Sequence, residues 1–156
     1  LVVVLDWYTK EIVGWELSLR AKTSEWKEAL DRALCRKFPC GVRGQGLSLI
    51  SDNGSQPTSV AFMTETAGLD INQIFCSYDN PRGNAETERV IRTIKEELLW
   101  LNEFGSFEEA ETRIGAWIEE DYNRLYVHSA LGYLSPEEFA QQWAQTQEAT
   151  SAEAQI

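Results

Sequence analysis

The sequence predicts an α/β fold in which a mixed sheet is flanked by helices, and three observations point to it. The chain has 156 residues, of which 43% are hydrophobic, and this is enough to bury the core of one domain. It opens on an uninterrupted apolar run over 1–5, which is typical of an interior strand. Farther on, short strand-like runs alternate with stretches in which apolar residues recur at helical spacing. Such alternation favours a sheet covered by helices.

The first half of the chain predicts the element order β-β-α-β-α-β. The expected strands cover residues 1–6, 11–19, 47–51 and 70–76, and the expected helices cover residues 23–38 and 58–67. Polar residues between the first two strands suit the turn of a hairpin. Pro39 ends the first helix because proline cannot continue it. Gly68 closes the second because glycine readily adopts the left-handed conformation at a helix end.

The second half predicts three helices after a loop at 77–84. The first begins at Ala85 and carries one apolar stripe, formed by Val90, Ile91, Ile94, Leu98 and Leu101. Ser106 can cap the second helix, which runs to about Tyr122. The third fades near Gln147 into a stretch rich in Thr, Ser, Ala and Glu.

Length and composition limit the class of protein. We expect one folded domain over 1–143 and a disordered acidic tail over 144–156. No apolar stretch approaches the roughly 20 residues that span a bilayer, so we expect a soluble domain with no membrane partner. The three cysteines form neither an even set for disulfides nor a metal-binding spacing, which favours a reducing cytoplasm.

Charge is the main observation against a nucleic-acid partner. The net charge is −11, and binding to a phosphate backbone relies on lysine and arginine. Much of the acid gathers in 103–121 and 137–153. Four basic residues cluster around Glu88 instead: Arg82, Arg89, Arg92 and Lys95. A locally basic site on an acidic domain is therefore compatible with the composition.

Two carboxylates stand out because of their surroundings. Asp52 follows the expected strand at 47–51 and precedes an Asn-Gly pair, and Glu88 lies in the first turns of the next long helix. Taken alone, Asp52 is typical of a turn aspartate that bonds its own backbone, and Glu88 is a favourable charge at a helix N-terminus. Taken together, they can place two hard oxygen ligands at one sheet edge, as a magnesium-dependent phosphoryl-transfer site requires.

The remaining candidates have ordinary structural interpretations beside functional ones. Arg92 and Lys95 follow Glu88 by four and seven residues on one helix face, either as solvated charges with a weak Glu88–Arg92 ion pair or as phosphate contacts. The single histidine, His128, is not expected to act as a base, because two-metal phosphoryl transfer needs none. Most of the six tryptophans fall on apolar positions, so we expect them in the core and in interfaces rather than on a base-stacking platform.

Four motifs occur in a fixed order along the chain. They are LDWYTKEIVGW at 5–15, SDNGSQPTS at 51–59, GNAETERVIRTIKEEL at 83–98 and YNRLYVHSALGYLSPEEF at 122–139. In this order they resemble the integrase-like core of bacterial insertion-sequence transposases. The 35 residues between Asp52 and Glu88 match the spacing of the retroviral integrase and transposase superfamily, whose site has two aspartates and a glutamate.

The resemblance implies a ribonuclease H-like fold and a site in which three carboxylates hold two Mg²⁺ or Mn²⁺ ions. Asp52 matches the second carboxylate and Glu88 the third, as catalytic residues and metal ligands. Arg92 and Lys95 match basic positions that face DNA in related integrases, and we assign Arg89 to the same DNA-binding set.

The first carboxylate of the family has no clear counterpart in the chain. In the family it lies on a strand that precedes the hairpin, and the element order predicted above lacks that strand. Asp6 is the weaker candidate for this ligand because its motif matches the turn between the second and third strands. We therefore expect the ligand upstream of Leu1, in a longer protein of which this chain is an inactive piece.

Two classes of function follow from the resemblance. The leading hypothesis is the catalytic core of a DNA transposase that cuts and joins phosphodiesters, with transposon ends and target DNA as partners. A ribonuclease H-like nuclease that cuts without joining is the alternative among enzymes. The alternative outside enzymes is an inactive transposase remnant that acts as an oligomerising interaction module. We expect a homo-oligomer in the bacterial cytoplasm.

Overall fold

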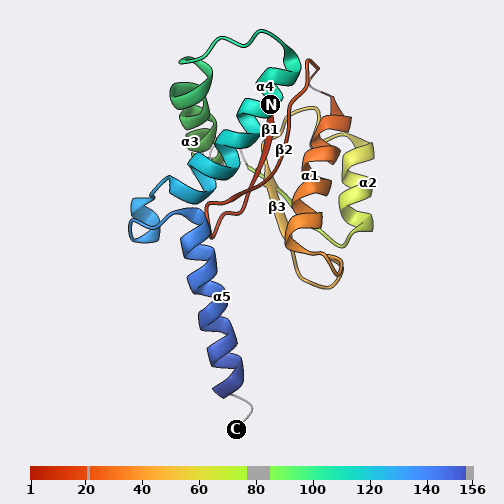
Figure 1. The fold of residues 1–156 in the computed structure, drawn as a ribbon. Helices are drawn as coiled ribbons and strands as arrows, with labels where there is room; N and C mark the ends of the chain where they lie inside the picture. Colours follow the sequence, from red (N-terminus) through yellow and green to blue (C-terminus); the bar gives the residue numbers. More distant parts are fainter. Residues whose placement is uncertain (21, 77–84, 154–156) are drawn as a thin grey trace. The chain divides into compact units, whose positions relative to one another are not determined.

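The structure is a computed structural model that describes residues 1–20, 22–76 and 85–153 (Figure 1). The chain divides into two compact units. The first comprises Leu1–Leu5 and Val13–Asn102, and the second comprises Asp6–Ile12 and Glu103–Ile156. The predicted α/β class and the predicted order of the first six elements are confirmed. The domain boundary predicted at residue 143 stays a prediction.

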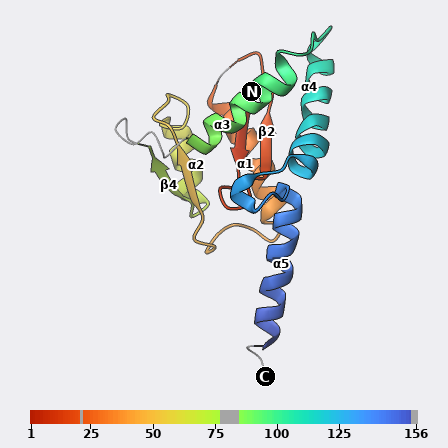
Figure 2. The ribbon, with the colours of Figure 1, turned by 90° about the vertical axis from the view of Figure 1, so that its left-hand side faces the viewer.

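In the part of the chain that the structure describes, four short strands form two separate pairs. They are β1 (Val2–Leu5), β2 (Ile12–Glu16), β3 (Ser48–Ser51) and β4 (Asn72–Phe75). β1 pairs with β2, and β3 runs parallel to β4 with Ile50 opposite Ile74. Within the described residues, no strand pairing joins the two pairs. Figure 2 shows β3 and β4 together on one side of the β1–β2 hairpin.

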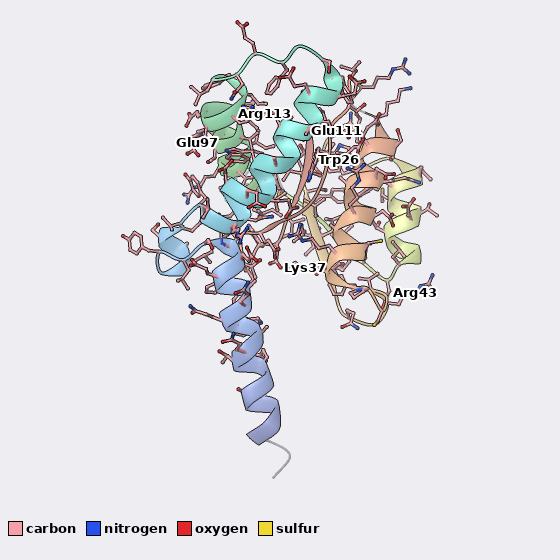
Figure 3. All side chains as sticks on the ribbon, in the orientation of Figure 1. Trp26, Lys37, Arg43, Glu97, Glu111 and Arg113 are labelled. Carbon is pink, nitrogen blue, oxygen red and sulfur yellow. The ribbon has the colours of Figure 1, made fainter. Side chains whose placement is uncertain are left out.

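Helices complete the first unit. α1 spans Thr23–Lys37, α2 spans Val60–Gly68, and α3 spans Ala85–Ile94 and continues as the π-helical segment η2 (Lys95–Leu99). All of them and β2 contribute apolar residues to the interior: Val13, Ala29, Leu30, Ala33, Phe62, Val90, Ile94 and Leu98. Trp26, labelled in Figure 3, joins α1 to α2, because its ring meets that of Phe62 edge to face with centroids 6.0 Å apart.

β2 passes so close to α1 that only glycine fits at position 14. A Cβ on Gly14 would lie 2.3 Å from the Ala29 carbonyl oxygen and 2.8 Å from the Cβ of Ala33. Arg32 of α1 strengthens the same contact by donating to the Trp15 carbonyl at 3.0 Å, and its guanidinium lies 5.8 Å from the centroid of the Trp15 ring. These contacts fix the hairpin on α1 and therefore fix the position of β1.

The second unit combines the hairpin turn with several helical segments. Its elements are α4 (Phe107–Ala116), the π-helical segment η3 (Trp117–Asn123), the short 3-10 helix η4 (Ser129–Leu131) and α5 (Pro136–Glu153). Its buried apolar residues include Ile12, Ile114, Ile118 and Tyr122. Ser106 caps α4 as predicted, by accepting the Glu109 N–H at 3.1 Å. No helix in the described part of the chain combines the length and apolarity needed to cross a bilayer.

The last helix is longer than the sequence predicts. α5 runs to Glu153 rather than fading near Gln147, so this part of the expected disordered tail over 144–156 is helical. Alanine, glutamine and glutamate in this stretch favour a helix. The threonines do not interrupt it, and the hydroxyls of Thr146 and Thr150 donate to backbone carbonyls four residues earlier, each at 2.9 Å.

Asn123 binds the backbone of Ile12 within the second unit. The asparagine is 2% exposed, its Oδ1 accepts the Ile12 N–H at 2.8 Å, and its Nδ2 donates to the Ile12 carbonyl at 3.0 Å. The Asn123 side chain thus bonds the backbone N–H and carbonyl of Ile12, the first residue of β2, which a neighbouring strand would otherwise pair with.

Replacing this asparagine should destabilise the fold. Asn123→Ala leaves the buried N–H and carbonyl of Ile12 without their partner, so we expect a loss of about 2–4 kcal/mol in unfolding free energy by chemical denaturation. Asn72→Ala is the matched control, because its exposed amide makes only a long 3.4 Å bond to Ser48, and it should change stability by less than about 0.5 kcal/mol. Equal losses in the two variants would contradict this role of Asn123.

Candidate active site

Asp52 stands where β3 ends. It is exposed, and its Oδ1 accepts the Gly54 N–H at 2.9 Å, which closes a turn. Because β3 and β4 are parallel, their carboxyl ends meet at one edge, and Asp52 lies at that edge. The turn bond uses Oδ1 and not Oδ2. The turn role and the ligand role considered from the sequence are therefore compatible in one side chain.

Two amide side chains fasten the loop after Asp52 to β4. Asn53 donates through Nδ2 to the Cys76 carbonyl at 2.5 Å, just beyond the end of β4. Gln73 of β4 donates through Nε2 to the carbonyl of the buried Pro57 at 2.8 Å. The loop is held at both ends, so β4 as well as β3 sets the position of Asp52.

The same loop closes on itself before α2 begins. The Thr58 hydroxyl donates to the Gly54 carbonyl at 2.8 Å. The Ser59 hydroxyl oxygen accepts the Phe62 N–H at 3.3 Å and so caps α2. Although much of this segment is exposed, its backbone is therefore tied at several points.

Glu88 lies on an exposed face in the first turns of α3. The opposite side of the helix buries Val90 and Ile94, and α3 contacts β1. Glu88 is thus carried by a helix that is packed against the hairpin. Between these two described residues, Glu88 and Arg92, the weak ion pair considered from the sequence does not form.

Three cations lie beside Glu88 on the same helix. Arg89, Arg92 and Lys95 are all exposed. Arg92 and Lys95 share the stripe of Glu88, at spacings of one and two helical turns, and Arg89 is its neighbour around the helix. Arg82, which the sequence places in the same cluster, lies outside the described residues.

Asp52 and Glu88 do not complete a metal site alone. Within the ranges that the structure describes, no three carboxylate, histidine or cysteine side chains lie close enough together to hold a metal ion. Two carboxylates nevertheless suit Mg²⁺, which prefers oxygen ligands and usually keeps several waters. Each residue therefore offers a donor of the type that a divalent cation takes.

Two candidate residues of the second unit serve local structure. The Oδ1 of Asp6 accepts the N–H groups of Tyr8 and Thr9 at 2.9 and 3.1 Å, inside the hairpin turn. His128 forms an isolated antiparallel bridge through its backbone, and its ring meets that of Tyr122 edge-on with centroids 5.4 Å apart. The turn role of Asp6 is the one that the sequence favours, and His128 has contacts of a structural kind.

The classification follows from comparison with protein families. Residues 1–81, more than half of the chain, match the family described as Integrase core domain. This chain belongs to the integrase core domain family. Residues 69–136 match a second family with the same description, so the two matches together cover both carboxylates of the candidate site.

Bacterial insertion-sequence proteins are relatives of this integrase core. It is 31% identical over 139 residues to the transposase for insertion sequence element IS904 of Lactococcus lactis, covering 89% of this chain and 53% of that protein. It is 30% identical over 143 residues to transposase InsF for insertion sequence IS3A of Escherichia coli, covering 89% and 47%. The chain thus spans about half the length of these curated relatives. The predicted resemblance to the cores of insertion-sequence transposases is confirmed.

Solved structures share the fold of the integrase core. The catalytic core domain of BIV integrase superposes with a TM-score of 0.66 at 17% identity, covering 94% of this chain and 88% of that one. A chain of the simian T-cell lymphotropic virus intasome in complex with PP2A regulatory subunit B56 gamma gives 0.50 at 19% identity, covering 71% and 37%. The predicted ribonuclease H-like fold is confirmed.

Sequence patterns do not point to the residues that hold the Asp52 loop. Asn53 carries one signal, an amide next to the candidate carboxylate, but an Asn-Gly pair is first of all a turn signal. Gln73 has only its polarity within a short strand. Both roles depend on which segments meet in space.

Removing the Asn53 amide should loosen the Asp52 loop without unfolding the protein. In Asn53→Ala the loop loses its bond to the end of β4, so we expect about tenfold faster hydrogen exchange over residues 53–58 and a stability loss of about 1 kcal/mol. Asn72→Ala removes an amide from β4 that does not touch the loop, and it should leave this exchange unchanged. The same exchange rates in both variants would show that Asn53 does not hold the loop.

Proposed function

We propose that residues 1–156 belong to the catalytic core of a DNA transposase that cuts and joins DNA phosphodiesters with two divalent metal ions. The observation that carries the proposal is the position of Asp52. It is an exposed carboxylate held at the carboxyl edge of the β3–β4 pair, in an integrase core and with the superfamily spacing to Glu88. Relatives that are named transposases support the same reaction.

Asp52 and Glu88 are the proposed catalytic residues and would hold Mg²⁺ or Mn²⁺. When bound, such ions supply Lewis-acid stabilisation of the charge that develops at a phosphodiester. The chain's own contribution is to hold the ligands in place. The tied loop orients Asp52, and the packed helix α3 presents Glu88. Both residues are exposed, which suits a site that must admit a DNA backbone.

Arg89, Arg92 and Lys95 are the proposed DNA contacts. A phosphate that approaches Glu88 would meet the two cations of its stripe one and two turns farther along α3. The proposed DNA partners are transposon ends and target DNA. Because the net charge is −11, DNA binding would depend on this local set rather than on the overall field of the protein.

The third carboxylate is proposed to lie on a further strand, upstream of Leu1, that pairs with β1. β1 reads Val-Val-Val-Leu, the composition of a strand buried on both faces, yet all four residues are only half-buried. The Asp6 N–H donates to the Glu11 carbonyl inside the hairpin. Antiparallel alternation then turns the backbone groups of Val3 and Leu5 away from β2, toward a position that another strand can take.

β3 supports the same position from its other side. The Ser51 carbonyl accepts the Cys76 N–H at 2.9 Å, so alternation along β3 turns the backbone groups of Ile50 away from β4. One additional strand between β1 and β3 would pair with both and join the two pairs into a single mixed sheet. A carboxylate side chain on that strand would complete the ligand set. Asp6 remains the weaker candidate for this third ligand, because its Oδ1 already accepts two N–H groups in the hairpin turn.

Residues 1–156 alone would then be inactive, because two carboxylates cannot fix both metal ions. A nuclease of the ribonuclease H type remains the alternative among enzymes. β1 pairs with β2 alone among the described strands, and its other edge favours a second alternative, an oligomerising remnant, because an open strand edge can pair with another copy. A homo-oligomer is proposed in either case.

Metal binding tests the assignment of Asp52 and Glu88. In NMR spectra of the chain, Mn²⁺ should broaden the amide signals around these two residues and leave those around Asp6 sharp. Asp52→Asn and Glu88→Gln should each weaken Mn²⁺ binding at least tenfold, because each removes a charged ligand. Asp6→Asn is the matched control and should bind Mn²⁺ as the parent does. Broadening centred on Asp6, or binding that survives Asp52→Asn, would contradict the assignment.

A DNA assay separates the three functions. With native flanking sequence restored, a transposase should nick labelled DNA in Mg²⁺ and join the 3′ end to a second duplex. Nicking without joining would indicate the nuclease. Neither activity, together with concentration-dependent oligomers by light scattering, would indicate the remnant.

A further inference from the structure

Trp100 is exposed at the end of the helix that carries Glu88. It follows η2 directly, and 70% of it is accessible to solvent. The sequence predicts most tryptophans in the core and in interfaces. Trp117 is buried with 7% exposure, but Trp7 and Trp143 are exposed as Trp100 is, and Trp100 is the most exposed of the three. Exposure alone would not single out Trp100, because scattered exposed apolar residues are common. Its position at the end of the helix that carries Glu88, Arg92 and Lys95 does.

The π-helical turn decides which face Trp100 joins. Its N–H donates at 2.9 Å to the carbonyl of Lys95, five residues earlier, whereas an ordinary α-helix would bond it to Glu96. Trp100 therefore lies one turn beyond Lys95. It extends the stripe of Glu88, Arg92 and Lys95 by one aromatic residue.

The same turn explains an apolar residue that does not pack as the sequence predicts. Leu101 belongs to the predicted apolar stripe of this helix, but it is 73% exposed. The extra residue in the π turn rotates everything after Leu98, which is the last buried member of the stripe. Trp100 therefore lies on the polar stripe of the helix, and Leu101 no longer lies on the apolar stripe.

We propose that Trp100 binds DNA by stacking its indole ring on an unpaired base. The inference deepens the proposed function and rests on the proposed DNA contacts of Arg92 and Lys95. A DNA strand whose phosphates contact these two residues would reach the Trp100 ring next. An indole face stacks on any base, but only on one that has left the double helix. The ligand class is therefore single-stranded DNA or an opened duplex end.

Charge on the helix explains why such a contact matters. The proposed DNA contacts comprise three cations, Arg89, Arg92 and Lys95, whereas the net charge of the chain is −11. Glu96 and Glu97 are exposed on η2 near them (Glu97 is labelled in Figure 3). Phosphate contacts in this setting are few, and their strength falls as salt rises. Stacking does not depend on counterion release, so it would hold DNA where the cations alone hold it weakly.

Salt dependence distinguishes the two kinds of contact. The affinity of the 156-residue chain for fluorescent oligo-dT of about 20 nucleotides would be measured by anisotropy at about 50 mM and about 200 mM salt. Trp100→Leu should lower the affinity about tenfold at both salt concentrations, because it removes the aromatic face. Trp100→Phe keeps an aromatic face and should bind within about threefold of the parent. Lys95→Ala should instead reduce the slope of log K against log salt by about 0.7.

Leu101→Ala is the matched control, because it changes an equally exposed neighbour off the stripe. It should leave affinity for oligo-dT unchanged. Equal losses in Leu101→Ala and Trp100→Leu, with a shift in oligomeric state by light scattering, would overturn the inference in favour of an interface with a second copy. A loss with Lys95→Ala but none with Trp100→Leu would overturn the inference alone. No loss with either variant would overturn the DNA-binding face and the inference together.

Discussion

The candidate site depends on the parallel pairing of β3 with β4. Parallel pairing brings the carboxyl ends of both strands to one edge, so the segments that follow β3 and β4 become neighbours that a side chain can join. Asn53 makes that join by donating to the Cys76 carbonyl, and Gln73 makes a second one to Pro57. With the loop tied to β4, Asp52 can use Oδ1 for its turn and keep a defined direction for the carboxylate. A loop aspartate acquires the fixed position that a ligand needs.

The helix formed by α3 and η2 has one buried side and one exposed side. One side buries Val90 and Ile94, and another exposes Glu88, Arg92 and Lys95. The π turn then shifts the register by one residue, which moves Trp100 onto the exposed stripe. A carboxylate, cations and an aromatic ring thus follow one another along a single helix whose packed side fixes all of them.

Local signals explain what the sequence predicts correctly. Ser106 caps α4 and the loop at Asp52 forms a turn, because each depends on residues a few positions away. Contacts between distant segments leave no such signal, which is why the bonds of Asn53, Gln73 and Asn123 were not predicted. Trp100 and Leu101 depart from prediction for another reason. The helix keeps ordinary α-helical spacing only up to Lys95. The π turn over Lys95–Leu99 then changes the face on which Trp100 and Leu101 lie.

We propose that β1 and β3 flank a position for one more strand, which would complete the sheet and the carboxylate set. Amide hydrogen exchange by NMR tests it most directly, at Leu5 and Ile50, whose N–H groups point away from β2 and β4. We expect rapid exchange of both amides in residues 1–156. Exchange should be slower by about a hundredfold or more once native flanking sequence supplies the strand. Slow exchange of both amides in residues 1–156 alone, or rapid exchange in the longer protein, would contradict the proposal.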